Sequence, residues 1–433
     1  MPIQGEIQVQ TIKDIFSFMK GNVLVMTICE CVWRATVDVI WPFLPLYVIE
    51  LGGSYETIGI IMAVGNAASL ILYPVGGFIA DYQGRIKLIS TMTFIYGMGF
   101  LINGFTNTWQ WLAVGMFIQS LVTFYFPARQ ALIADSIPPV KRGIGFATTV
   151  AIPSAFGMAA PIIGSYLIGK YGMIPAMKGL YLMSFFVASG IALFRFKFLK
   201  ETVSNPKTID LSVSKFPALV VRSYKSVFGV LKDVPRRLYT LSFLVSFSVL
   251  FGSLTSSFWI IRAQEIIGLS VSEWANVILI SGAVSVVLGI PAGSIVDRFN
   301  KKNIAGICMI VGAIQVYGFL LCTTYTHVVI LAVFTTLTNG LMNPSFQSLF
   351  ANMTPKAQRG RILASIGGGG VWIMRGAYGS GILGKSLQTV GMLLSGYLYR
   401  YDNALPWQIM SVALFVFGIL FLILVEEPKI AEL

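Results

Sequence analysis

Long apolar segments alternate with short polar segments along the whole chain. A helix that crosses the roughly 30 Å hydrocarbon core of a bilayer needs about 20 apolar residues, and only helices or closed barrels satisfy the backbone in lipid. We therefore predict an all-α membrane protein with twelve transmembrane helices. The predicted spans are 23–48, 57–80, 86–105, 109–134, 144–169, 174–195, 238–261, 273–296, 303–323, 327–350, one within 361–400, and 406–425.

The spans fall into two sets of six that are related in sequence. Residues 127–147 align without gaps on residues 344–364, with eight of 21 positions identical. Two repeats of the same orientation place a substrate site at mid-membrane between them. The predicted organisation is a cytoplasmic N-terminus over 1–21 without a signal peptide, a six-helix bundle over 22–196, a basic linker over 197–237, a second six-helix bundle over 238–426 and a cytoplasmic tail over 427–433.

Composition and charge then narrow the class of protein. Hydrophobic residues make up 56% of the chain and charged residues 11%, against about 45–50% and 25% in globular proteins. This excludes a soluble enzyme. The net charge of +13 would suit a nucleic-acid partner, but Lys and Arg are concentrated in alternate connecting segments. By the positive-inside rule we expect a cell-membrane protein with both termini in the cytoplasm and no nucleic-acid partner.

The linker has an apolar helical face that includes Val220 and Tyr224, opposite basic residues such as Arg222. We expect a surface helix that binds anionic lipid headgroups. The alternative is a solvated tether without a preferred surface.

Two loops at matched positions carry a motif. The motif residues are Gly77, Asp81, Gly84 and Arg85 in the first half, and Gly293, Asp297 and Arg298 in the second. The loops resemble the G-x-x-x-D-R-x-G-R-[KR] loop of the major facilitator superfamily, although Tyr82 and Asn300 depart from it. The resemblance implies alternating access of two six-helix halves, in which Asp and Arg latch helix ends in one state. An ordinary positive-inside loop is the alternative.

The first predicted span carries three ionisable residues. Glu30, Arg34 and Asp38 are spaced i, i+4, i+8 and so share one helical face. Charges at membrane depth are costly and normally face a cavity or a partner. Internal pairing of the triplet leaves one negative charge, which we expect to bind a proton or a cation. An acid four residues before Pro42, with Pro45 following, resembles helix 1 of the drug:proton antiporters. The alternative is a structural brace.

Helices 4 and 5 match these antiporters only in part. The family places an intramembrane arginine where this chain has Met116, three residues before Gln119. Helix 5 contains Gly157, Pro161 and Gly164 in a pattern similar to the antiporter motif. We expect these small residues to let helices 5 and 8 approach closely; general small-residue packing is the alternative.

Further residues are expected to line the pathway or to form a polar network at the cytoplasmic helix ends. The cavity candidates are Trp33, Asn66, Gln119, Tyr125, Trp259, Asn339 and Asn343, and the network candidates are Arg129, Asp135, Arg142 and Arg359. Aromatic residues among them could instead be interfacial anchors.

The segment 379–386 matches the phosphate-binding pattern G-x-x-x-x-G-K-[ST]. We expect no nucleotide binding, because that motif needs a soluble α/β sheet around it. The same region is 14 residues longer than its counterpart in the first half. A straight helix over 361–400 would reach about 60 Å, so we expect the glycine run 367–370 to break it and to leave Arg375 and Lys385 in the broken part.

The sequence predicts a transporter and not an enzyme, with no metal and no cofactor other than a proton gradient. The preferred function is proton-coupled efflux of an amphipathic small molecule by a monomer. The alternative is uptake or exchange of a small organic anion that pairs with Arg34. A non-transporting receptor or a lipid scramblase on the same scaffold is a further alternative.

Overall fold

The computed structural model describes residues 18–82, 84–138, 142–203, 220–221, 224–225, 234–354, 362, 366, 369–374, 376–379 and 381–427. The elements of the first half are α2 (Gly21–Val37), η2 (Trp41–Phe43), α3 (Leu44–Glu50), α4 (Tyr55–Tyr82), α5 (Arg85–Phe105), α6 (Trp109–Val122), η3 (Thr123–Tyr125), α7 (Phe126–Ser136), α8 (Arg142–Gly157), α9 (Ala160–Tyr171) and α10 (Met173–Phe198). Those of the second half are α12 (Arg236–Ser253), α13 (Trp259–Glu265), α14 (Val271–Arg298), α15 (Lys301–Leu320), α16 (Tyr325–Met353), β1 (Gly369–Trp372), β2 (Gly376–Gly379), α18 (Gly381–Tyr401) and α19 (Leu405–Leu424).

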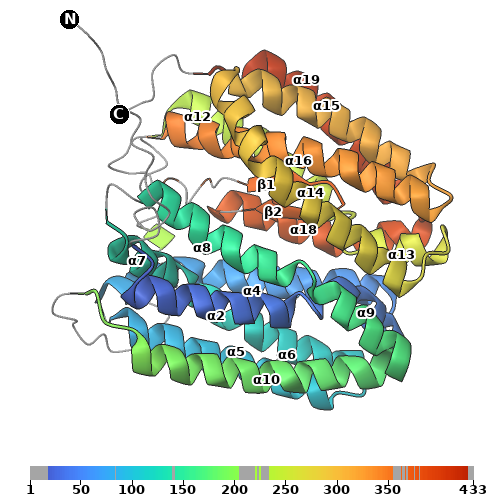
Figure 1. The fold of residues 1–433 in the computed structure, drawn as a ribbon. Helices are drawn as coiled ribbons and strands as arrows, with labels where there is room; N and C mark the ends of the chain where they lie inside the picture. Colours follow the sequence, from blue (N-terminus) through green and yellow to red (C-terminus); the bar gives the residue numbers. More distant parts are fainter. Residues whose placement is uncertain are drawn as a thin grey trace, which may run out of the picture.

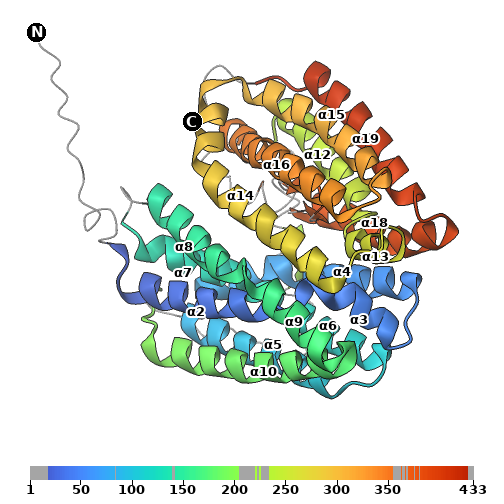
Figure 2. The same cartoon turned by 45° about the vertical axis from the view of Figure 1, so that its right-hand side comes forward.

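Helices of the first half lie together on one side of the molecule and helices of the second half on the other (Figure 1). Helix α4 packs along α18, and α9 packs against α14, so these pairs join the two sets. In Figure 2, α8 and α14 converge where α9 lies and diverge toward their other ends. We call the side of the molecule with α13 the α13 end, and the opposite side, where Arg85 begins α5, the Arg85 end.

Four predicted spans are interrupted helices rather than continuous ones. The first breaks between α2 and α3, where Pro42 and Pro45 stand at the starts of η2 and α3. Proline lacks the N–H that continues a helix, which accounts for this break and for the one before Pro161 in α9. Span 109–134 passes through η3, and span 238–261 breaks at a turn between α12 and α13.

The prediction of an all-α fold is wrong in one region, because β1 and β2 form an antiparallel hairpin with Val371 opposite Ala377. The expected break near the glycine run is confirmed, and the long region becomes this hairpin followed by α18. Lys385 lies within α18 and not in the broken part. Arg375 lies outside the described residues, as does most of the linker whose surface helix we predicted.

Within the described ranges, nine helical stretches are long and apolar enough to cross a membrane. The three predicted spans missing from these nine are 23–48, 238–261 and the one within 361–400. The first two are divided by their breaks, and the third, α18, is long enough at 21 residues but less apolar, since it contains Lys385 and Gln388. The chain is therefore a multi-pass helical membrane protein.

Candidate functional site

A cavity of about 680 Å³ lies between the two sets of helices. The first half contributes Arg34 and Asp38 at the end of α2 and Trp41 in η2. The second half contributes Trp259 from α13 and Gly282 from α14, among others. Both halves line this cavity with residues from their interrupted helices.

The charged groups of the cavity are one ion pair. Arg34 Nη1 lies 3.9 Å from Asp38 Oδ1, and the two side chains are 49% and 30% exposed. Gly157 on α8 lies directly against this pair, since a Cβ there would collide with Asp38 Oδ2 and come within 3.2 Å of Arg34 Cβ. The glycine thus leaves room for two charged side chains between α2 and α8.

The expected pairing of Glu30 with Arg34 is wrong. Glu30 Oε1 instead accepts hydrogen bonds from Arg129 on α7 and, at 3.0 Å, from Arg195 on α10. Arg195 also donates to Thr93 Oγ1 at 2.8 Å and is 1% exposed. Glu30 therefore ties three helices together in the interior of the first half, away from the residues that line the cavity.

The expected surplus of negative charge is also wrong. The region around α2 holds three guanidinium groups, those of Arg34, Arg129 and Arg195, against the carboxylates of Glu30 and Asp38. Sequence reasoning missed Arg195, which is the last residue of the sixth predicted span and is followed by Lys197, so it resembled the basic residues that flank a span. Its partner could not be known, because the contact joins residues 165 positions apart.

Several expected cavity residues have other roles. Trp33 packs on Tyr96 at 5.1 Å between centroids, Gln119 is buried against Gly99 of α5, and Tyr125 packs on Phe126. Asn66 donates at 2.9 Å to Lys385 O and Thr389 Oγ1, so it joins α4 to α18. Asn339 and Asn343 bind the hairpin backbone, and Asn339 also lines a second, smaller hollow between α14 and α16. Of the seven candidates, Trp259 lines the central cavity.

The fifth span, formed by α8 and α9, approaches the eighth, formed by α14, as predicted, but the close contact is made at a different glycine. A Cβ on Gly282 of α14 would lie 2.5 Å from Met158 Cγ, whereas Gly157 and Gly164 face helix 1. A Cβ at Gly164 would collide with Val39 O and lie 2.8 Å from Phe43. Pro161 lines the cavity. The small residues of helix 5 therefore fit it against the broken part of helix 1.

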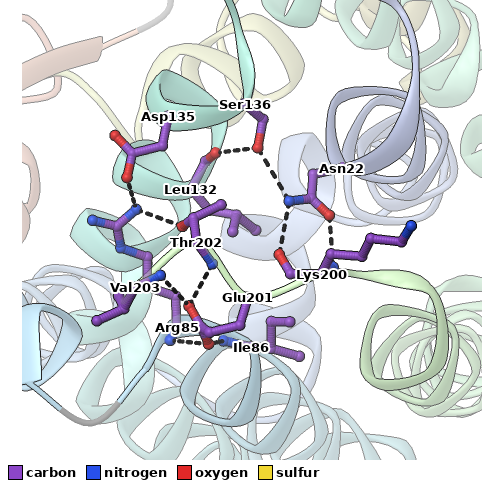
Figure 3. A network of polar contacts seen from close by, with 10 residues as sticks. All are labelled: Asn22, Arg85, Ile86, Leu132, Asp135, Ser136, Lys200, Glu201, Thr202 and Val203. Carbon is purple, nitrogen blue, oxygen red and sulfur yellow. Dashed lines mark hydrogen bonds and ion pairs between the residues drawn. The ribbon is translucent and has the colours of Figure 1, made fainter. Parts of the chain in front are cut away.

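The first motif loop belongs to a network at the Arg85 end (Figure 3). Gly84 precedes α5 with φ of 88°, a conformation that favours glycine. Arg85 pairs with Asp135 and donates to Thr202 Oγ1 at 2.8 Å. The network thus joins the start of α5, the end of α7 and the chain after α10.

Glu201 accepts the N–H groups of Arg85 and Ile86 on Oε2, and those of Thr202 and Val203 on Oε1. Partial burial alone would raise the pKa of Glu201, but these four backbone donors hold it below its ordinary value. The carboxylate therefore caps the N-terminus of α5 in its ionised form.

Asn22 extends the network, because it donates to Ser136 Oγ at 3.1 Å and to Lys200 O at 2.8 Å. Gly77 and Asp81 lie in the last turns of α4, and the described part of the structure does not include their side chains. The side chain of Arg142 and all of Arg359 lie outside it too. The latch role of Asp81 therefore stays a prediction.

The second motif loop is built differently. Asp297 and Arg298 are exposed, and a Cβ on Gly293 would meet nothing within 4 Å. Asn300, which replaces the glycine of the first loop, has φ of −63° and caps α15 by accepting from Asn303 N at 2.9 Å. Lys301 Nζ lies 3.6 Å from Glu427. A side-chain cap thus replaces the glycine turn.

A polar cluster at the α13 end joins the halves, and we call its three residues, Tyr55, Glu265 and Tyr399, the Glu265 latch. Tyr55 donates to Glu265 Oε1 at 2.8 Å, and Tyr399 donates to Oε2 at 3.1 Å. Beside it, Arg400 donates to Glu56 at 2.8 Å. Sequence reasoning did not predict this latch, because its members come from three helices that are far apart in the chain, α4, α13 and α18.

The segment 379–386 does follow a strand, β2, but the helix already begins at Gly381. Gly379 N donates to Gln388 Oε1 at 3.2 Å, and Lys385 Nζ donates to Ser69 Oγ at 3.0 Å. The loop of free N–H groups that cradles phosphate in such motifs is thus replaced by helix and by side-chain contacts.

Comparison with known families agrees with this architecture. The model of the Major Facilitator Superfamily matches residues 26–376. The chain belongs to this superfamily. It is accordingly a transporter rather than an enzyme, with a fold related to the drug:proton antiporter branch that the motifs resemble.

Relatives and solved structures are consistent with this membership. Multidrug resistance protein 2 of Bacillus subtilis is 25% identical over 363 residues, which are 80% of this chain and 82% of the relative. Multidrug resistance protein MdtG of Proteus mirabilis is 29% identical over 348 residues, covering 76% and 80%. The human organic anion transporter MFSD10 superposes with a TM-score of 0.65 at 15% identity, covering 92% and 98%. A POT family transporter bound to 5-aminolevulinic acid gives a TM-score of 0.71 at 15% identity, covering 93% and 96%.

Proposed function

We propose that this protein exports amphipathic small molecules by proton-coupled alternating access. It would cross the membrane twelve times as two six-helix bundles, with both termini in the cytoplasm. Two multidrug resistance proteins among its relatives support the substrate class. The distribution of basic residues between alternate loops supports the orientation, which makes the Arg85 end cytoplasmic.

The observation that carries the proposal is the position of Asp38. Of the described residues that line the central cavity, Asp38 is the one carboxylic acid, and it lies where both halves meet. Its ion-pair partner is 3.9 Å away and both side chains are partly exposed, so water or a substrate can reach the carboxylate. Asp38 is therefore our choice for the proton carrier.

Glu30 is a poor carrier by comparison. Its carboxylate accepts from two arginines and is 14% exposed. Protonation would leave Arg129 and Arg195 with a weakened partner inside the protein, which is costly at membrane depth. We assign Glu30 to a structural brace and Asp38 to the coupling step.

In this mechanism the ionised Asp38 attracts the positive end of a substrate in competition with Arg34. A proton that enters from outside neutralises Asp38, which weakens its hold on the substrate and favours release. The neutral form then loses its ion pair, and the proton leaves when the cavity faces the cytoplasm. Proton and substrate thus alternate at one carboxylate, because each lowers the affinity for the other.

Contacts between the halves support an inward-facing state. The Glu265 latch and the Arg400–Glu56 pair join the halves at the α13 end, which would face outward. Toward the Arg85 end α8 and α14 diverge (Figure 2). Opening of the outer side must break the latch, so Glu265→Ala should shift the population toward the outward-facing state.

Transport in proteoliposomes tests the proton carrier, with ethidium as the probe and an imposed pH gradient. Asp38→Asn should abolish gradient-driven ethidium movement while downhill exchange continues. Glu30→Gln is the matched control: it should lower thermal stability but keep the proton-to-substrate ratio of the wild type. Wild-type coupling in Asp38→Asn would disprove the assignment.

A second candidate is exchange of a small organic anion, favoured by the 49% exposed guanidinium of Arg34 in the cavity. Radiolabelled benzoate in the same proteoliposomes tests it. Benzoate exchange that is lost in Arg34→Gln, together with no ethidium movement in the wild type, would favour this candidate. Movement of a fluorescent phospholipid without either probe would instead indicate a scramblase.

A further inference from the structure

The hairpin formed by β1 and β2 is a fixed part of the second half. Asn339 donates to Ile373 O and accepts from Ile373 N, both at 3.0 Å, and Asn343 donates to Val371 O at 3.4 Å. Non-helical backbone at membrane depth is tolerated where protein groups satisfy it. The side-chain amides of Asn339 and Asn343 on α16 satisfy the hairpin backbone in this way, so the hairpin is held in a fixed position against α16.

A second hollow of about 270 Å³ lies beside the hairpin. One face of α14, one face of α16 and Trp372 of β1 line it, and the hollow is open on one side, where Ile295 and Leu337 are exposed. Ser285 of α14 lines both this hollow and the central cavity, and Met374, two residues after Trp372, lines the central cavity. The two spaces therefore adjoin, with the hairpin between them.

The chemistry of the two spaces differs. The second hollow is lined mostly by aliphatic and glycine residues, and its lining in the described chain contains no charged side chain. The central cavity contains the Arg34–Asp38 pair. An apolar cavity of roughly 150 Å³ is enough to bind benzene, so the second hollow has room for a larger ring system.

We propose that this hollow, the hairpin pocket, binds the aromatic end of the exported compound while its charged end lies at Arg34 and Asp38 in the central cavity. The inference rests on the proposed function and narrows its substrate class to compounds with a cationic group and an apolar ring system. Trp372 supplies an aromatic face for that ring system.

Two glycines allow the pocket to be filled without disturbing its walls. A Cβ on Gly289 would meet nothing within 4 Å, and a Cβ on Gly340 would meet only Ala292 Cβ at 3.8 Å. Alanine therefore fits at both positions and favours the helix. Leucine at either position would occupy the space that the ring system needs.

The experiment measures equilibrium binding to the full chain in phosphatidylethanolamine–phosphatidylglycerol nanodiscs, without a pH gradient. The probes are tetraphenylphosphonium, ethidium and rhodamine 6G. Gly340→Leu and Gly289→Leu should each raise Kd by about tenfold, which corresponds to the loss of roughly 55 Å² of apolar burial. Gly340→Ala and Gly289→Ala should stay close to the wild type, and Trp372→Ala should weaken binding more than Trp372→Phe.

Thermal unfolding of each variant shows whether it is folded. Because the test uses two glycine positions, it remains valid if one of the two leucine variants does not fold. Unchanged Kd values in a folded leucine variant overturn the hairpin pocket and leave the proposed function intact. Absence of binding of all three probes to the wild type overturns both. A co-purified lipid that is lost in Gly340→Leu, with unchanged probe binding, would assign the pocket to an acyl chain and so also overturn the proposal.

Discussion

The two halves of the chain fill an equivalent interior position with different kinds of side chain. In the first half, Arg129 and Arg195 bind the carboxylate of Glu30. At the equivalent positions of the second half, Phe346 and Phe421 pack edge to face with centroids 5.5 Å apart. An ionic cluster and an aromatic pair thus occupy the same place in the two repeats.

The equivalence of these positions follows from sequence and structure together. Arg129 aligns with Phe346 in the ungapped repeat of 127–147 on 344–364. Arg195 and Phe421 each stand six residues before a glutamate, Glu201 or Glu427, that accepts an N–H at the start of the third helix of its half. The sixth helices of the two halves, α10 and α19, therefore place equivalent residues, Arg195 and Phe421, in the interior.

The difference shows that packing at this position does not require an ionic cluster. Desolvation of ionic groups is expensive, and well-packed apolar residues of similar volume commonly give equal or greater stability. We therefore interpret the Glu30 cluster as a device that fixes the geometry of α2, whose end carries Arg34 and Asp38. The second half has no charge at the end of α12 to position, since its turn is formed by serine and threonine.

The motif loops extend the contrast. Asp135, which pairs with Arg85, aligns with Asn352, so the second half lacks this acid. Lys301 instead pairs with Glu427 at 3.6 Å. Among the described residues, the ion pair of the first half at this end contains the buried Arg85, whereas the second half also has the exposed pair of Arg237 with Glu426 at 2.7 Å.

The largest effect is expected from Glu30→Gln, which should lower the free energy of unfolding by about 3–5 kcal/mol because it leaves the buried Arg195 and the partly buried Arg129 without a charged partner. Titration with dodecyl sulfate measures it. The triple variant Glu30→Ser, Arg129→Phe, Arg195→Phe replaces the ionic cluster by the aromatic pair of the second half and should be far more stable than Glu30→Gln. An equally unstable triple variant would show that the two solutions are not interchangeable.

The next effect compares Arg85→Ala with Lys301→Ala. Arg85 is buried and has two side-chain partners, so its loss should cost about 2–4 kcal/mol. Lys301 has one longer ion pair, and its loss should cost about 1 kcal/mol or less. Unfolding in dodecyl sulfate again reports both values. Equal losses would contradict the asymmetry between the loops.

A smaller effect concerns pH. The pKa of Glu201 is lowered in the folded protein, so its stabilising contribution is present above the unfolded value of about 4.3 and is lost as the pH falls below it. The contribution should be about 1 kcal/mol or less, since the side chain is exposed. Glu201→Gln should flatten the acid limb of the stability curve. Glu427→Gln is the control, as Glu427 accepts one backbone N–H at 3.3 Å, and an identical flattening there would refute a role specific to Glu201.

The smallest effect should come from Asn352→Asp, which restores an acid at the position that aligns with Asp135, the partner of Arg85. We expect a gain of about 0.3–1 kcal/mol from a new surface ion pair. A double-mutant cycle with Lys301→Ala isolates the pair from other consequences of the new charge. A coupling energy of zero would mean that the two loops differ in backbone geometry and not only in this residue.

The sequence by itself determined the membrane class, the superfamily and most helix positions. Span length, loop charge and the two motif loops are local properties of the chain, so they can be recognised in the sequence without knowledge of the tertiary structure. The break near residue 367 was predictable for the same reason, from helix length and glycine content.

Only the tertiary structure decided which charges meet. One helical face suggested that Glu30 would pair with Arg34, but the partner of a buried charge is set by whichever helices pack against it, here α7 and α10. The sequence likewise predicted Asn339 and Asn343 to line the pathway, whereas the structure shows that both amides bind the hairpin and that Asn339 also lines the hollow beside it. The spacing of residues along one helix determines toward which side their side chains point. The residues that those side chains contact belong to other helices, whose positions are set by the tertiary fold.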